Sequence, residues 1–99
     1  MLLFLISFAN ANESIQATFK RANELYIKEK YTEAIALFES IEKQGNSSAD
    51  LYFNIANCYY KLGKVAPSIY YYEKALLLNP DDEAAQTNLS FAQKMAIDD

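Results

Sequence analysis

The 99-residue chain contains no histidine, no tryptophan, one cysteine, two glycines and two prolines. Without histidine, the Ser–His and Cys–His pairs that activate catalytic nucleophiles cannot form. The single cysteine, Cys58, excludes an internal disulfide and a cysteine-rich zinc site. Gly45 and Gly63 lie too far apart to build a phosphate-binding loop. The sequence therefore predicts no enzyme, no catalytic residues, no cofactor, no metal and no small-molecule substrate.

Positive charge is also scarce. Nine Lys and Arg residues face thirteen Asp and Glu residues, which gives a net charge of −4. The nine are scattered, and nucleic-acid binding, which depends on neutralising phosphates, is disfavoured. The hydrophobic content of 52% indicates a globular chain of one domain. Because a core of this size is barely sufficient, a homodimer through an exposed repeat face stays open.

The N-terminus differs from the rest of the chain. Residues 2–8 are an apolar run, and Ala9-Asn10-Ala11 follows as a small-x-small triplet. This pattern predicts a signal peptide over residues 1–11 and an exported, periplasmic or envelope-associated protein. The run is too short to span a bilayer, which needs about 20 apolar residues. No Lys or Arg precedes Leu2, so either the start is expected to be truncated or Met1 is not the true initiator. The alternative is an apolar helix packed on the domain, which would leave the protein in the cytoplasm.

Two segments of the chain superimpose at a fixed spacing of about 34 residues. Apolar and small residues recur at matching positions in Ala22-x2-Leu25, Ala34 and Phe38, and in Tyr52-x2-Ile55-Ala56-x2-Tyr59, Ser68-x3-Tyr72 and Pro80. The pattern resembles the tetratricopeptide repeat (TPR), a pair of antiparallel helices whose neighbours stack to bury a common core. The resemblance implies an all-α, right-handed α-solenoid of helix-turn-helix units that binds other proteins.

The 3.6-residue period and the breakers predict five helices. They are expected at about 12 or 14–29, 31–43, 49–62, 65–78 and from the acidic run 81–83 to about 95. Residues 12–46 then form a first repeat, 47–80 a second, and 81–97 a capping helix, with Asp98 and Asp99 starting a linker. Tyr72 is expected in the core, and Tyr70 and Tyr71 on the helix surface.

The first helix of each repeat should line a concave groove, at positions offset from its packing ridge. Aromatic rings there offer apolar area, and asparagine amides can bond a peptide backbone as both donor and acceptor. The alternative is that the phenylalanines only pack between repeats. The predicted groove residues are Phe19, Asn23, Tyr26, Ile27, Phe53, Asn54, Asn57, Tyr60, Lys61, Asn88 and Phe91, with Thr87 beside them.

Chaperone-binding TPRs hold a C-terminal carboxylate with two asparagines and three cationic side chains. Asn23 and Asn54 match the two asparagines. The cationic positions fall on Phe19, Ala84 and Asn88, and none of these is charged. An Hsp70/Hsp90-type clamp is therefore not expected.

A narrower resemblance covers nearly the whole chain. The sequence is similar to the N-terminal portion of BatE-type TPR proteins of Bacteroides-type aerotolerance operons, through residues 51–63, 66–69, 72–76, 79–82 and 88–92. That family implies an envelope location and a scaffold beside von Willebrand-type and MoxR-associated Bat partners. A membrane span and an SH3-like domain usually follow in the family. Neither is present here, so the chain is expected to be a fragment that meets the membrane only by association or through a missing C-terminal region.

The expected function is a non-catalytic scaffold that binds a partner peptide or protein in the concave groove. One alternative is a periplasmic chaperone or assembly factor that holds client segments in the same groove. Another is a docking module from a longer enzyme or sensor.

Overall fold

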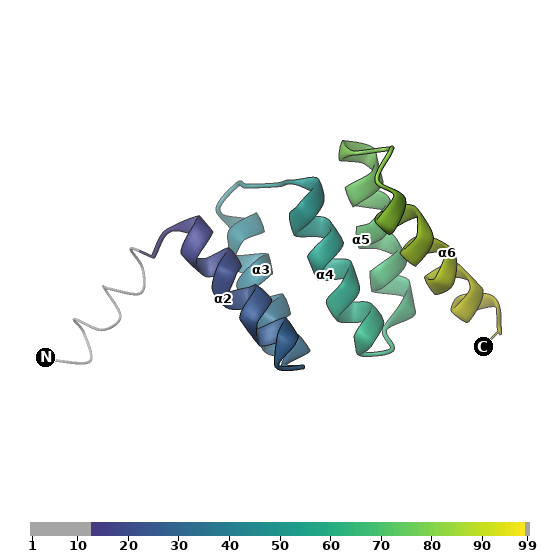
Figure 1. The fold of residues 1–99 in the computed structure, drawn as a ribbon, viewed down its shortest axis with the longest axis horizontal. Coiled ribbons are helices and arrows are strands. Elements are labelled where there is room, and N and C mark those ends of the chain that lie inside the picture. The colour runs from purple at the N-terminus through teal and green to yellow at the C-terminus, as the bar shows by residue number, and fades with distance from the viewer. Residues whose placement is uncertain (1–12, 99) are drawn as a thin grey trace, which may run out of the picture.

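The computed structural model describes residues 13–98, and these residues form five α-helices without a strand. The helices are α2 (Ile15–Ile27), α3 (Tyr31–Lys43), α4 (Ala49–Lys61), α5 (Val65–Leu78) and α6 (Glu83–Asp98). Figure 1 shows consecutive helices running antiparallel, with α2, α4 and α6 in one layer and α3 and α5 in the other. This is the all-α repeat array that the sequence predicts, two helix pairs followed by a single helix. The proposed signal peptide, residues 1–11, lies outside the described residues.

The three helices of the first layer begin with the same kind of cap. Ser14 accepts a hydrogen bond from the Ala17 N–H at 3.1 Å, and Ser48 accepts one from the Leu51 N–H at 3.0 Å. Before α6, the Asp82 carboxylate accepts from the backbone N–H three residues later at 3.1 Å. Each capping residue lies one repeat after the previous one, and each satisfies a backbone donor that the helix leaves free. The repeat period is therefore present in the N-capping residues of the helices as well as in the core.

Helix ends match the sequence expectations at α3 and α5 and differ elsewhere. The first helix ends at Ile27 and not at residue 29, because Glu29 adopts a left-handed backbone conformation. The helix α4 ends at Lys61, one residue early. The last helix continues to Asp98, so the linker expected at that residue is wrong. Residues 83–98 contain no proline or glycine, and nothing in that stretch stops the helix.

The turns between paired helices are the same in both repeats. The Glu29 N–H donates to the Tyr26 carbonyl, and the next N–H donates to the Leu25 carbonyl, at 2.9 and 2.8 Å. In the second repeat, Gly63 and its successor make the same two bonds at 3.0 and 2.9 Å. This pattern is the Schellman motif, which needs one residue at positive φ. Gly63 supplies it with φ 74°, whereas Glu29 adopts φ 63° against the preference of its side chain.

The core divides into two connected clusters along the array. The larger one joins α2, α3 and α4 around the fully buried Phe38 and Ile55. The smaller one joins α4, α5 and α6 around Tyr72, which lies between Ala56 and Ala92. The alanines let the helices approach closely, and Ser68, fully buried in α5, bonds back to a carbonyl of its own helix at 2.6 Å. Cys58 is also fully buried, as expected of a small apolar residue.

A cluster of four tyrosines and one lysine lies between α4 and α5, and its lysine connects the second repeat to the first. The Lys74 ammonium lies 4.4, 5.2 and 5.4 Å from the ring centroids of Tyr52, Tyr70 and Tyr71 and pairs with Glu42 at 3.2 Å. The ring of Tyr71 also stacks on that of Tyr59, with centroids 5.9 Å apart. The prediction that Tyr71 is a surface residue was therefore wrong, since its ring packs against Tyr52 and Tyr59 of α4. Tyr70 is 56% exposed, as predicted.

Among residues 13–98, no helix combines the length and the apolar character that crossing a bilayer would require.

Candidate functional site

The surface that α2, α4 and α6 turn away from α3 and α5 is called the concave face below. None of the eleven predicted groove residues is buried. Ile27, Lys61 and Phe91 are exposed, and the other eight are partly exposed. Exposure is a requirement for contact with a partner, and whether these residues bind one stays a prediction.

Pairs of asparagines connect neighbouring helices of the concave face. Asn54 in α4 donates its amide N–H to Asn23 in α2 at 3.3 Å. One repeat later, Asn88 in α6 donates to Asn57 in α4 at 3.1 Å. Both partners of the second pair occupy the positions that the first pair holds one repeat earlier. The amides therefore hold the repeats in register, and each keeps donor or acceptor capacity for a ligand because an amide has two donors and two lone pairs.

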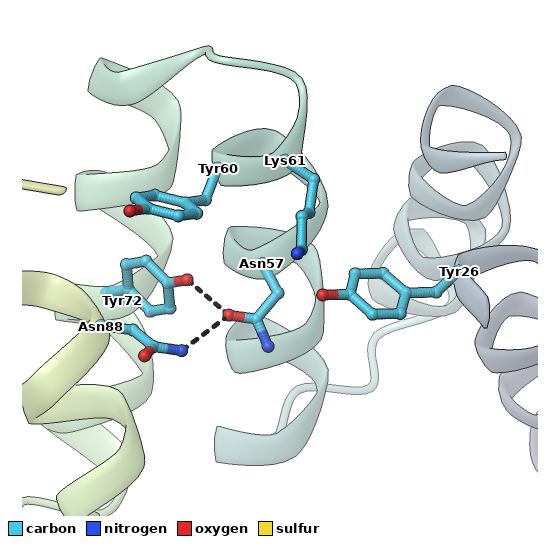
Figure 2. A pocket seen from close by; sticks show the side chains of 6 residues that line it. All are labelled: Tyr26, Asn57, Tyr60, Lys61, Tyr72 and Asn88. Carbon is cyan, nitrogen blue, oxygen red and sulfur yellow. Dashed lines mark hydrogen bonds between the residues drawn. The ribbon is translucent and has the colours of Figure 1, made fainter. Parts of the chain in front are cut away.

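A pocket of about 270 Å³ opens at the middle of the concave face. Figure 2 shows it between α2, α4 and α6, with α5 contributing at the back. Five of the predicted groove residues meet there, joined by one residue predicted to be core. The lining residues are Tyr26, Asn57, Tyr60, Lys61, Tyr72 and Asn88.

Tyr72 explains how a core residue comes to line this pocket. Its ring is fully buried, and burial raises the pKa of its phenol, so the hydroxyl stays protonated. A protonated phenol must donate, and it donates to the Asn57 side-chain oxygen, which also accepts from Asn88 (Figure 2). The amide of Asn57 is thereby fixed in one orientation by two donors from two helices.

The aromatic groove residues differ in how firmly the core holds them. The ring of Phe19 packs edge-on against Phe38 at a centroid distance of 5.4 Å, and that of Phe53 packs against Tyr72 at 6.0 Å. Both pack against the core clusters, and these ring contacts are made within one repeat. Phe91 is 54% exposed, and Ile27 is 77% exposed. Only the last two are available to a partner over most of their surface.

The clamp positions also have clear structural roles. Asn23 and Asn54 bond each other, and Asn88 bonds Asn57. Phe19 is packed on the core and Ala84 is exposed. No side chain at the three expected cationic positions carries charge, so the concave face lacks the positive residues of the chaperone clamp.

Four residues of this face were not predicted, namely Tyr72, Met95, Lys20 and Lys94. Tyr72 was assigned to the core alone, because a buried helix position does not reveal that its hydroxyl reaches a neighbouring surface. Met95 was omitted, although it lies one repeat after Lys61 and is 36% exposed. The repeat spacing alone would have found Met95, since Ile27 and Lys61 occupy the same position in the preceding repeats.

Two further observations concern reactive side chains of the described residues. Burial raises the pKa of the Cys58 thiol to about 12, so the sulfur stays protonated and unreactive. Within residues 13–98, no three His, Cys, Asp or Glu side chains gather closely enough to hold a metal ion.

Comparisons with known proteins agree with this architecture. Residues 49–82 match the tetratricopeptide repeat family. A region of 64 residues is 31% identical to tetratricopeptide repeat protein 16 of Homo sapiens and of Macaca fascicularis, over 65% of this chain. The chain spans only 7% of the length of these relatives.

Among solved structures, the chain is similar to the TPR2AB-domain:pHSP90 complex of yeast Sti1. The TM-score is 0.77 and the sequence identity 26%, over 90% of this chain and 37% of that one. Residues 49–82 are thus a tetratricopeptide repeat, and the described helices have the fold of a TPR solenoid. Proteins of this type are generally non-catalytic and mediate protein–protein interactions through their extended concave surfaces.

Proposed function

We propose that this chain is a non-catalytic interaction domain that holds an extended segment of one partner protein on its concave face. The observation that carries the proposal is the open pocket at the centre of that face, flanked by exposed apolar residues. Ile27 lies on the α2 side, and Phe91 and Met95 lie on the α6 side, with exposed fractions of 77, 54 and 36%. Apolar side chains around a polar centre form the arrangement that protein interfaces use for anchoring and specificity.

The asparagine pairs support an extended peptide as the ligand. Their unused N–H and C=O groups lie along the line from α2 to α6, and a peptide backbone offers matching acceptors and donors. The neighbour in the yeast Sti1 complex is itself a TPR domain with a bound pHSP90. The absence of clamp cations from this chain argues for a different peptide chemistry.

We further propose that the domain acts in the cell envelope, within a Bat-type complex. The apolar run 2–8 and the small-x-small triplet that ends at Ala11 support export. Expression of the full chain in a Bacteroides-type host, followed by mass spectrometry of the periplasmic fraction, tests it. A mature N-terminus at Asn12 supports export, and an intact N-terminus in the cytoplasm refutes it.

The binding proposal is tested by crosslinking in the same host and identification of the captured proteins. The double variant Ile27→Ala/Phe91→Ala removes exposed apolar area and should leave the fold intact, unlike truncation of the half-buried Phe53. The matched control is Tyr70→Ala/Leu77→Ala, whose residues are 56 and 81% exposed on α5.

One dominant partner that the concave-face variant loses and the α5 variant keeps establishes a scaffold. Many weakly captured proteins, all reduced by the concave-face variant, establish the alternative of a chaperone that holds client segments. Equal capture by both variants and the unaltered chain refutes binding on the concave face. Circular dichroism of each variant confirms that loss of capture is not loss of fold.

A further inference from the structure

The amide of Asn57 presents its nitrogen to the central pocket. Its oxygen uses both lone pairs, one on the Tyr72 hydroxyl and one on the Asn88 amide at 3.1 Å. The nitrogen consequently points the other way, toward the space between α4 and α2 (Figure 2). Among residues 13–98 it has no hydrogen-bond partner, so two N–H donors are held ready for a ligand.

The groups around this nitrogen are donors as well. Figure 2 shows the Lys61 ammonium and the Tyr26 hydroxyl directed at the same space from α4 and α2. Tyr60 also lines the pocket, with its hydroxyl directed away from Lys61 and Tyr26 (Figure 2), and no carboxylate is among the lining residues. An ammonium beside amide N–H and phenol O–H groups matches a carboxylate, which only accepts hydrogen bonds and carries the opposite charge.

The distribution of charge over the concave face points to the same ligand. Four positions of the concave face recur with the repeat, at residues 20, 23, 26 and 27 of α2 and at the same positions one and two repeats later in α4 and α6, which gives twelve side chains. The only charged members are Lys20, Lys61 and Lys94, in a chain whose net charge is −4. The thirteen acidic residues all lie outside these twelve positions. These twelve positions thus carry only positive charge in an acidic protein, with Asp50 as the acidic residue at the adjacent repeat position of Ala84, and they favour encounter with an anionic segment.

The position of the pocket distinguishes an internal acidic residue from a C-terminal carboxylate. Exposed apolar surface continues on both sides of the pocket, at Ile27 in one direction and at Phe91 and Met95 in the other. A chain that ended in the pocket would cover only one of these flanks. A chain that passes across it covers both.

We propose that the central pocket binds the side-chain carboxylate of an internal Asp or Glu of the partner segment, with apolar residues on both sides of it. This inference rests on the proposed function and names the chemistry of the ligand. Asn57 and Lys61 are the residues that select the charge.

Peptides of defined sequence on a cellulose array test the selection. Each seven-residue peptide has capped ends and a central Glu, Gln or Lys between variable apolar residues. A further set ends in a free carboxylate after the first apolar residue. The unaltered full chain should bind the best Glu peptides at least about tenfold more tightly than their Gln counterparts, as expected for charge-assisted hydrogen bonds. The preference should shrink at high salt.

Two variants place the selection in the pocket. Asn57→Asp keeps the oxygen that accepts from Tyr72 and Asn88 and replaces the two N–H donors by a carboxylate oxygen. This variant should abolish the preference for Glu peptides or replace it by a preference for Lys peptides. Lys61→Met alters only an exposed side chain and should reduce the preference without any change in folding. The matched control is Lys43→Met, which alters a lysine in the last turn of α3, as Lys61 is in the last turn of α4.

Each outcome has one meaning. A preference for Glu that both pocket variants lose and the control keeps supports the inference. Equal binding of Glu and Gln peptides overturns it and leaves the proposed function standing. Tighter binding of the free C-terminal set overturns it in favour of a terminal carboxylate. No binding by any peptide overturns the inference and the proposed function together.

Discussion

Exchanging Glu29 for glycine should stabilise the protein. Glu29 holds the left-handed position of a Schellman turn at φ 63°, where the next repeat has Gly63 at φ 74°. A side chain with a Cβ costs roughly 1–2 kcal/mol in this conformation. Glycine loses more conformational entropy on folding than other residues do, and this loss offsets about 0.5–1 kcal/mol of the strain that is relieved. The Glu29→Gly variant should therefore gain about 0.5–1 kcal/mol in free energy of unfolding, or about 2–8 °C in Tm for a domain of this size.

The reverse exchange in the second repeat is the matched control. A Cβ on Gly63 would meet no atom within 4 Å, so Gly63→Ala adds backbone strain and no steric clash. It should lower the free energy of unfolding by a similar amount, and the double variant should return near the starting value because the two turns share no contact. Urea denaturation followed by circular dichroism measures all three. A Glu29→Gly variant that is less stable than the unaltered chain would refute the argument from backbone strain.

Three further changes test the packing. Burial raises the pKa of Cys58 to about 12 in the folded state, so unfolding releases its proton above pH 9. Above that pH, the free energy of unfolding should fall by up to about 1.4 kcal/mol per pH unit more in the unaltered chain than in Cys58→Ala. Equal pH dependence of the two proteins in urea denaturation would contradict this expectation. Lys74→Met removes a cation from three tyrosine rings and an ion pair and should cost about 1 kcal/mol, whereas Lys43→Met stays within about 0.5 kcal/mol in the same denaturation assay. Ser68→Ala removes a buried hydroxyl that bonds only within its own helix, so the free energy of unfolding should stay level or rise by less than about 1 kcal/mol. A clear loss of stability would show that the hydroxyl stabilises the helix contact.

The helices and their order could be predicted because the signals were local. The repeat spacing, Pro80 and Gly63 define the repeat units and their turns, and α3 and α5 have the predicted bounds. The end of α6 could not be predicted, because a chain without a breaker does not indicate where a helix frays. Glu29 stands where the next repeat has Gly63, and only the structure shows that it keeps the glycine conformation.

The site was less predictable, because its chemistry depends on contacts between repeats. The exposed groove residues follow from the repeat register, and so does Met95. The roles of Tyr72 and Asn57 do not, since a hydrogen bond between side chains of two different helices leaves no local pattern. Tyr71 was misplaced because its ring packs on Tyr52 and Tyr59 of the paired helix α4, and a contact between two helices leaves no local pattern.

The shared oxygen of Asn57 links ligand binding to the attachment of the last helix. The bond from Asn88 that fixes this amide is also a bond that holds α6 against α4, and the adjoining core contact of α6 comes from small residues such as Ala92. If α6 detaches, the amide keeps only the Tyr72 donor from α5 and its orientation is held less firmly. A ligand that needs the oriented amide must therefore stabilise the attached state of α6. Reciprocally, a change that loosens α6 weakens the binding of the ligand by the same free energy. Amide hydrogen exchange in residues 83–98 would report this coupling as slower exchange in the complex.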